Sequence, residues 1–127
     1  MTASAFSIQV EPERDLVRIA LSGFFAPSDV SAFVAARNKA HQELRCAANA
    51  HLTLVDVRAL KIQPQDAVAA FRATLNAPEH RSRRLAFITA STLARNQLTR
   101  AVGTRAARFF VDPAEAEAWL IEGDQEG

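Results

Sequence analysis

Short apolar segments alternate with helical segments along most of the chain, and this alternation most limits what the sequence can fold into. Residues 52–57, 85–89 and 108–111 are apolar and rich in β-branched or aromatic side chains, as buried strands are. Helical stretches separate them, and strands joined by helices form right-handed crossovers in a parallel sheet. The sequence therefore predicts one α/β domain of 127 residues, with its core at about residues 6–121 and frayed ends.

The beginning of the chain shows a different pattern. Phe6, Ile8 and Val10 alternate with polar residues, as in a half-buried strand. A polar turn at residues 11–15 leads into a second apolar segment at residues 16–21. A short connection favours an antiparallel hairpin, so we expect a mixed sheet of about five strands with a parallel centre. The first strand would be an edge, which would allow a homodimer.

About four helices are expected to cover the sheet. The first is predicted over residues 27–47, where apolar side chains recur at steps of three and four. The second is predicted over residues 64–75 and the third over residues 91–102. The last begins after Asp112, whose carboxylate is expected to accept from early amides of the helix, and Glu115 would complete a capping box.

Composition excludes several classes of protein. Fifteen basic and fourteen acidic residues give a net charge of +1, which argues against non-specific binding to nucleic acid or acidic membranes. The single cysteine, Cys46, forbids an internal disulfide and suits a reducing cytoplasm. No apolar run approaches the roughly 20 residues of a membrane span, and the start lacks the pattern of a secretory signal. We therefore expect a cytoplasmic protein.

Few residues carry a recognisable chemistry. None of the three histidines, His41, His51 and His80, has a metal-ligand spacing to another histidine or to Cys46. His41 is expected to face the core. The sequence has neither a Gly-x-Ser-x-Gly nucleophile motif nor a glycine-rich phosphate loop. We therefore expect no catalytic residues, no metal and no cofactor, and no enzymatic activity.

Arg37 stands out because it falls on the apolar stripe of the first predicted helix. A buried guanidinium without a partner would cost several kcal/mol. Three arrangements are open: Arg37 extends past the sheet edge into water, it pairs with a carboxylate, or its helix face meets a partner. Extension into water is the favoured expectation, given the general habits of arginine.

Charge is segregated along the second half of the chain. Residues 80–111 contain seven arginines and no acidic residue, whereas residues 112–127 contain six acidic residues and no basic one. The arginines are Arg81, Arg83, Arg84, Arg95, Arg100, Arg105 and Arg108. One interpretation is a basic surface for nucleic acid, phospholipid headgroups or an acidic protein. We favour the other, in which the acidic last helix neutralises the arginines internally, so no nucleic acid partner is expected.

Two motifs and the order of elements resemble the STAS domain, and more closely its bacterial SpoIIAA-like branch, which is related in architecture to CRAL-TRIO lipid-binding domains. Residues 54–58, Leu-Val-Asp-Val-Arg, resemble the family's apolar strand that ends in aspartate. Residues 109–120 resemble its phenylalanine-rich last strand, acidic helix start and Ala-x-x-Trp-Leu close. The likeness covers about residues 6–120.

The resemblance implies a non-catalytic interaction module that binds a regulatory protein. In anti-sigma factor antagonists of this family, a kinase phosphorylates a serine in an Asp-Ser-Ser-Gly-like segment that opens the second helix. The matching residues 63–66 are Gln-Pro-Gln-Asp, and no serine or threonine lies between Val57 and Ala73, so this switch does not carry over. The candidate partner-binding residues lie in and after the matched strand. They are Asp56, Arg58, Lys61 and Asp66.

A second reading of the same resemblance is a ligand-binding domain. The CRAL-TRIO relationship implies a small apolar or anionic lipid-like ligand between sheet and helices. The candidate pocket-lining residues come from three predicted helices. They are Phe33, Arg37, Phe71 and Leu98.

Overall fold

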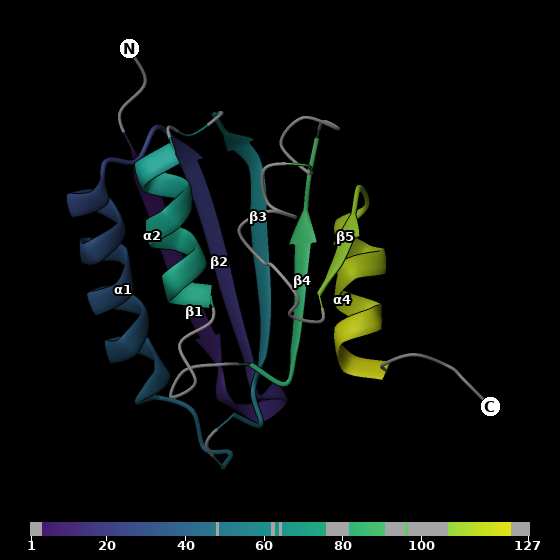
Figure 1. The fold of residues 1–127 in the computed structure, drawn as a ribbon. Coiled ribbons are helices and arrows are strands. Elements are labelled where there is room, and N and C mark those ends of the chain that lie inside the picture. Colours follow the sequence, from purple (N-terminus) through teal and green to yellow (C-terminus); the bar gives the residue numbers. More distant parts are fainter. Residues whose placement is uncertain are drawn as a thin grey trace.

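The computed structural model describes residues 4–47, 49–61, 63, 65–75, 82–90, 96 and 107–122. In the described residues, strands and helices alternate as the sequence predicts (Figure 1). The elements are β1 (Ala5–Glu11), a 3-10 turn η1 (Pro12–Arg14), β2 (Leu16–Gly23), α1 (Pro27–His41), β3 (Leu52–Leu60), α2 (Gln65–Leu75), β4 (Arg84–Ile88), β5 (Arg108–Phe110) and α4 (Pro113–Glu122). The helix predicted over residues 91–102 lies outside the described residues, apart from residue 96.

The five strands form one mixed sheet in the order β1-β2-β3-β4-β5. β1 pairs with β2 in antiparallel orientation, and the remaining pairs are parallel, which confirms the predicted hairpin and parallel centre. One register row runs across all five strands. Its members are Ile8, Ile19, Val55, Phe87 and Phe109. Because residues in register share a face, this row forms a continuous apolar band on one side of the sheet.

Helices cover both faces of the sheet, but unequally (Figure 1). α1 and α2 lie over the face that carries the apolar band, and the larger core cluster forms there. α4 packs against β3, β4 and β5 on the opposite face, over a smaller core cluster. Beside α4, the ends of β1, β2 and β3 form a shallow groove of about 420 Å³ on that opposite face. We call this region the open face, and its residues include Ala5, Ser7, Ala20, Ser22, Asp56 and Arg58.

Two boundaries differ from the predictions by three residues or more. α1 ends at His41, not at residue 47, because the amides of Gln42, Glu43 and Leu44 bond to carbonyls three residues back, which tightens the last turn and ends the helix. β3 continues to Leu60, three residues beyond the predicted end, because its last residues still pair with β2 after a register shift. That shift places Leu60 opposite Gly23.

Local capping follows the sequence closely. The amide of Ala114 donates to Asp112 Oδ1 at 3.0 Å, which confirms the predicted acceptor role of Asp112 at the start of α4. At the start of α1, the amide of Ala26 donates to Asp29 Oδ2 at 2.8 Å. No helix within the described residues is long and apolar enough to cross a membrane.

Candidate functional site

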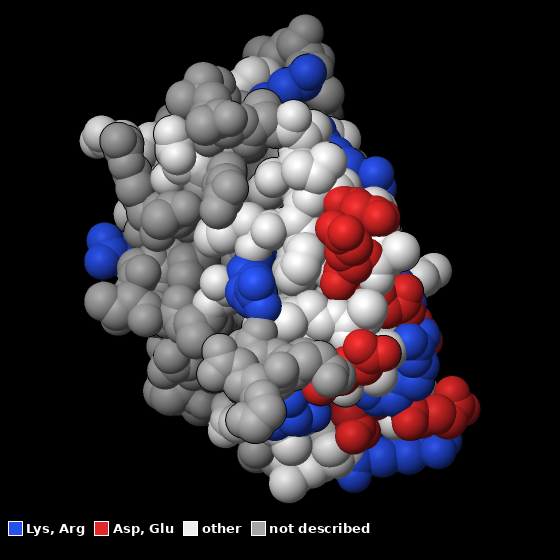
Figure 2. All heavy atoms as spheres, turned by 90° about the vertical axis from the view of Figure 1, so that its right-hand side faces the viewer, with Lys and Arg blue, Asp and Glu red and all other residues white. Residues whose placement is uncertain are grey.

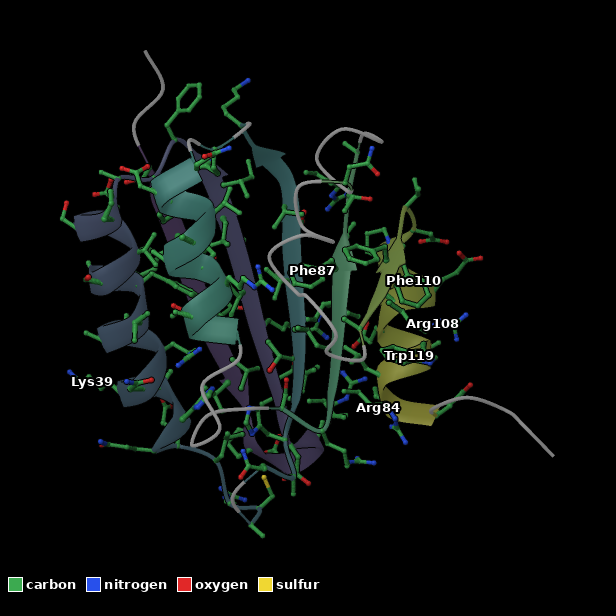
Figure 3. All side chains as sticks on the ribbon, viewed as in Figure 1. Lys39, Arg84, Phe87, Arg108, Phe110 and Trp119 are labelled. Atoms are coloured by element: carbon green, nitrogen blue, oxygen red, sulfur yellow. The ribbon has the colours of Figure 1, made fainter. Side chains whose placement is uncertain are left out.

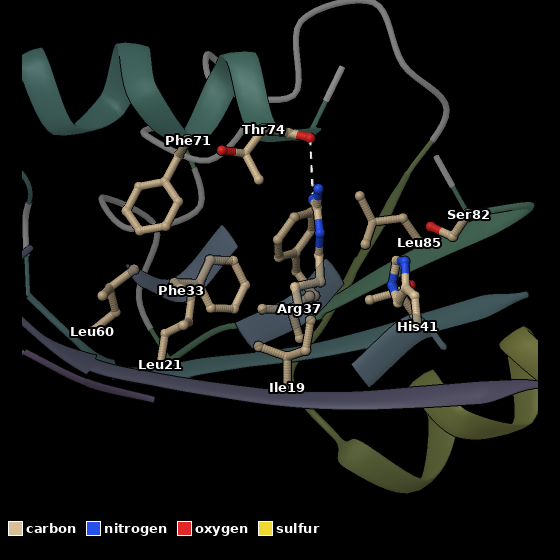
Figure 4. Close-up of a pocket in the computed structure, with 13 residues that line it drawn as sticks. Ile19, Leu21, Phe33, Arg37, His41, Leu60, Phe71, Thr74, Ser82 and Leu85 are labelled. Carbon is tan, nitrogen blue, oxygen red and sulfur yellow. Dashed lines mark hydrogen bonds between the residues drawn. The ribbon is translucent and has the colours of Figure 1, made fainter. Parts of the chain in front are cut away.

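A cavity of about 60 Å³ lies between the apolar band of the sheet and helices α1 and α2 (Figure 4). Three of the four predicted pocket residues, Phe33, Arg37 and Phe71, line it together. The fourth, Leu98, lies outside the described residues. The other lining residues come from strands β2, β3 and β4, from helices α1 and α2, and from the connection before β4. They are Ile19, Leu21, His41, Thr53, Val55, Leu60, Thr74, Ser82, Leu85 and Phe87.

Helical spacing explains how α1 and α2 reach the cavity. Phe33 and Arg37 are one turn apart on α1, and Phe71 and Thr74 are one turn apart on α2, so each pair lies on one helix face. The Phe33 and Phe71 ring centroids are 6.4 Å apart, and Phe25 meets Phe71 edge to face at 5.3 Å. Aromatic contacts therefore close one end of the cavity and hold the two helices together.

The opposite end of the cavity is more polar. Figure 4 shows His41 and Ser82 at this end, away from Phe71 and Leu60. The His41 ring lies 4.5 Å from the ring of His51, centroid to centroid, and Thr53 also lines the cavity. His41 faces the core, as predicted. The cavity is thus amphipathic, with phenylalanine rings at one end and imidazole and hydroxyl groups at the other.

Arg37 lies between the two ends and is only 7% exposed (Figure 4). Its Nη1 donates to the carbonyl oxygen of Thr74 at 3.2 Å. Its Nε and Nη2 donate to Asn38 Oδ1 at 3.4 and 3.2 Å. Both acceptors are neutral, and burial lowers the pKa of the Arg37 guanidinium, which still remains charged at neutral pH.

The position of Arg37 decides among the three arrangements left open by the sequence. An exposed fraction of 7% contradicts the favoured expectation that Arg37 extends past the sheet edge into water. Within the described part of the chain, no carboxylate lies within ion-pair distance of Arg37. The apolar packing of α1 on the sheet and α2 keeps the side chain inside, because its Cα lies in the middle of the buried stripe.

Asp56 and Arg58 form an ion pair on the open face. Residues i and i+2 of a strand point to the same side, so both side chains of this β3 pair lie on the face opposite the cavity. Arg58 Nη2 lies 2.7 Å from Asp56 Oδ2, and Arg58 Nε donates to Asp56 Oδ1 at 3.0 Å. The hydrogen bond from Arg58 lowers the pKa of the Asp56 carboxyl. Asp56 lies inside β3, not at its carboxyl end as expected.

Lys61 and Asp66 lie elsewhere, in the connection from β3 to α2 and at the start of α2. Lys61 is exposed, and its backbone amide donates to the carbonyl of Gly23 at 3.1 Å. Asp66 is exposed in the first turn of α2, and its Oδ1 accepts from the amide of Ala67 at 2.8 Å. The four predicted partner residues therefore divide into a pair within β3 and a pair after it.

Gln63 is a residue whose role the sequence did not reveal. It is buried, its Oε1 accepts from the amide of Phe25 at 2.7 Å, and its Nε2 donates to the carbonyl oxygens of Gly23, at 2.9 Å, and Lys61. One side chain thereby joins the chain after β2 to the chain after β3. No sequence signal identifies it, because its partners Gly23 and Phe25 lie 40 and 38 residues away.

Within the described residues, the ion pairs of α4 are with arginines of the N-terminal hairpin, and none is with the arginines of residues 80–111 that the acidic helix was expected to neutralise. Glu117 of α4 pairs with Arg14, at 2.7 Å between Nη1 and Oε1, and with Arg18, both from the N-terminal hairpin. Arg18 also pairs with Glu11. Acidic and basic side chains therefore lie side by side near α4 (Figure 2). For Glu117, burial raises the pKa, but hydrogen bonds from Arg18 and Arg14 outweigh it, so the pKa is lowered.

Two arginines of the basic segment contact α4 through groups other than carboxylates. Arg84 Nη1 donates to the carbonyl oxygen of Leu120 at 2.6 Å, near the end of the helix. The guanidinium of Arg108 lies 5.5 Å from the centre of the Trp119 ring and 5.9 Å from that of Phe110 (Figure 3). Both contacts are favourable for a cation. Arg81, Arg95, Arg100 and Arg105 lie outside the described residues.

Metal chemistry finds no support in the part of the chain that the structure describes. There, no group of three histidine, cysteine or acidic side chains lies close enough together to hold an ion. The described residues instead form an amphipathic cavity that contains a buried cation, and an open sheet face that carries an ion pair with no net charge.

Comparisons with known proteins agree on the fold. No protein-family model matches the sequence, and no curated protein matches it. Among solved structures, it is similar to an uncharacterised DUF3478-family protein with a SpoIIAA-like fold from Shewanella loihica PV-4, with a TM-score of 0.69 and 17% identity over 94% of this chain and 97% of that one.

A second solved structure, an anti-sigma factor antagonist from Mycobacterium paratuberculosis, has a TM-score of 0.61 and 11% identity. It covers 91% of this chain and 94% of that one. Identities this low support a statement about the fold alone. The chain therefore has the SpoIIAA-like fold that its resemblance to STAS domains predicts.

Proposed function

We propose that this protein is a non-catalytic interaction module that binds a regulatory protein partner through its open face. The observation that carries this proposal is the part of the sheet that α4 leaves uncovered, where Asp56 and Arg58 lie in a groove of about 420 Å³. The similar anti-sigma factor antagonist supports a partner that is a protein, since the fold is shared. The proposal assigns no catalytic step to this chain.

The open face is unusual for the strands that form it. β2 and β3 are parallel, and parallel strands are generally covered on both faces. Here Ala5, Ser7 and Ala20 are exposed, and their short side chains line the shallow groove. The Asp56–Arg58 pair places one negative and one positive charge on this face, so its net charge is zero. The Arg58 side chain is 47% exposed and can be reached by a partner. A partner with its own charged pair and a low ridge that enters the groove would complement this face.

Binding by this face would not depend on phosphorylation at the position used by the family. Residues 63–66, which match the family's serine segment, are Gln-Pro-Gln-Asp and contain no hydroxyl side chain. Gln63 is buried and hydrogen-bonded to three backbone groups, so it serves the structure of the connection. Asp66 supplies a permanent negative charge close by. We therefore propose that partner binding is constitutive.

Affinity purification of the full chain from its host tests the proposal. We expect one partner to be recovered in stoichiometric amounts, and Arg58→Glu to reduce its recovery at least tenfold, because the variant puts two like charges on the open face. Arg45→Glu is the matched control, since Arg45 is also exposed but lies outside the groove. Equal recovery by the wild type, Arg58→Glu, Lys61→Glu and Asp66→Lys would show that the proposed face is wrong.

A second candidate function is the binding of a small ligand in the cavity. The observation that favours it is the meeting of Phe33, Arg37 and Phe71 around one amphipathic space. The volume of about 60 Å³ is well below the roughly 300–1,000 Å³ of typical ligand pockets. This size favours a small molecule over a long lipid chain. Native mass spectrometry and ligand-observed NMR with the full chain would detect such a ligand, and their failure would count against this function.

A further inference from the structure

Arg37 places a positive charge inside the protein, and the described residues provide no carboxylate within ion-pair distance of it. Its side chain is 7% exposed, and the described residues provide it with two neutral oxygen acceptors, on Asn38 and Thr74. The carbonyl of Thr74 lies at the end of α2 and carries only part of a negative charge. An ion buried without a full counter-charge is strongly disfavoured, so the site would gain from an anion.

The guanidinium still has hydrogen-bonding capacity for such an anion. An arginine carries five N–H donors. The described residues accept from three of them: the single one on Nε, one on Nη1 and one on Nη2. One N–H on each terminal nitrogen remains, next to the cavity that Arg37 lines (Figure 4). These two donors suit a ligand that accepts with two oxygens, as a carboxylate does.

We propose that this cavity binds a small monocarboxylate, with its carboxylate at Arg37 and its short alkyl group against Phe33 and Phe71. The inference rests on the second proposed function, that the cavity takes a ligand, and names the chemical class of that ligand. Arg37 is the one arginine or lysine among the described lining residues, which favours a monoanion, because a dianion would bury an excess negative charge. The phenylalanine rings favour an alkyl group over a fully polar ion such as phosphate or chloride.

The size of the cavity sets the length of the alkyl group. The small volume of the cavity, about 60 Å³, favours a ligand as short as acetate or propionate over an eight-carbon chain. Ser82, Thr53 and His41 line the polar side of the same space. Hydroxyl and imidazole groups of this kind fix the orientation of a bound ligand. A ligand with so few atoms is expected to bind with a dissociation constant in the millimolar range.

Titration of the full chain with acetate, propionate, octanoate, phosphate and chloride at constant ionic strength tests the inference. Amide chemical shifts report binding, and the melting temperature reports stabilisation by a ligand that binds only the folded state. We expect saturable shifts with acetate and propionate at residues around the cavity, and none with phosphate or chloride. Propanol serves as the neutral analogue of propionate, and it should bind at least tenfold more weakly.

Variants separate the role of Arg37 from a general effect of charge. Arg37→Gln should weaken propionate binding at least tenfold, because the charge-assisted hydrogen bonds are lost. Lys39→Gln on the exposed side of the same helix is the matched control and should bind as the wild type does (Figure 3). Phe71→Trp keeps Arg37 but fills the cavity, so it should also lose binding. Circular dichroism of each variant checks that it folds.

Several results would overturn the inference. They are equal affinity of the wild type and a folded Arg37→Gln variant, equal affinity for propionate and phosphate, and tighter binding of octanoate than of propionate. Binding of propanol but not of propionate would overturn the carboxylate assignment while leaving the cavity as a ligand site. Because the Arg58→Glu experiment tests partner binding separately, failure of carboxylate binding leaves the protein-binding proposal standing.

Discussion

Arg37 and Thr74 join the two helices that cover the larger core, through a hydrogen bond of 3.2 Å from Nη1 to the carbonyl oxygen (Figure 4). Thr74 lies in the last turn of α2, where carbonyl oxygens have no partner within the helix. The guanidinium therefore satisfies an acceptor of one helix from the middle of another. It also places a cation at the negative end of the helix dipole. The bond is a structural use of Arg37 that is compatible with anion binding by its remaining donors.

Replacement of Arg37 should separate its charge from its packing. Arg37→Met keeps the volume and removes an ion with no carboxylate partner among the described residues, so its free energy of unfolding should match or exceed that of the wild type. Arg37→Ala should lose about 2 kcal/mol, because it also leaves a void. Urea unfolding of both variants measures the difference. A loss of more than about 3 kcal/mol in Arg37→Met would mean that the bond to Thr74 dominates.

Gln63 should contribute strongly to stability for a residue in a connection. Gln63→Ala leaves the amide of Phe25 and the carbonyls of Gly23 and Lys61 without their partner, so we expect a loss of about 2–3 kcal/mol in the free energy of unfolding. Gln65→Ala, at an exposed position two residues on, should change stability by less than about 0.5 kcal/mol. Equal effects of the two substitutions in chemical denaturation would contradict this role of Gln63.

The apolar band across the sheet should be the most sensitive part of the core. Phe87 is 2% exposed and stacks on Phe109 with 5.4 Å between ring centroids. Phe87→Ala should therefore lose about 3–5 kcal/mol of unfolding free energy, a large part of a typical domain's stability. Phe24→Ala is the control, since Phe24 is 45% exposed and should lose less than about 1 kcal/mol. A stability of Phe87→Ala near that of the wild type would disprove the packing described for this band.

Stability should fall with acid because of the carboxylates that pair with arginine near α4. In the folded state, Arg18 lowers the pKa of Glu11 below its ordinary value of 4.5, and the pKa of Glu117 is lowered as well. Above pH 4.5 these pairs contribute fully to stability. Below it, the unfolded chain takes up protons first, so the contribution is lost as the pH falls through the lower pKa of the folded state.

The pH dependence can be assigned to the network by substitution. Glu117→Gln should have a shallower decline in unfolding free energy between pH 5 and pH 3 than the wild type, at low salt. Glu122→Gln, at the end of the same helix, is the control and should retain the wild-type slope. Parallel curves for the wild type and Glu117→Gln would show that the pairs with Arg14 and Arg18 contribute nothing measurable.

Local patterns of the sequence predict much of the fold. Alternation in residues 6–10, apolar runs in the later strands and the cap at Asp112 each depend on neighbours a few residues away, and each is confirmed. Helical spacing also places Phe33 and Arg37 on one face, and the structure brings both to the cavity with Phe71. Such features follow from backbone geometry and burial, which repeat with fixed periods.

Contacts between distant segments decided the rest. The sequence alone determined a mixed α/β sheet with an arginine on a buried helix face, but the tertiary structure decided that this arginine bonds to α2 and stays inside. Likewise, Arg18 meets Glu117 across 99 residues, which no local pattern encodes. The physical reason is that hydrogen bonds and ion pairs are short-ranged and directional, so their partners are chosen only when packing brings two surfaces together.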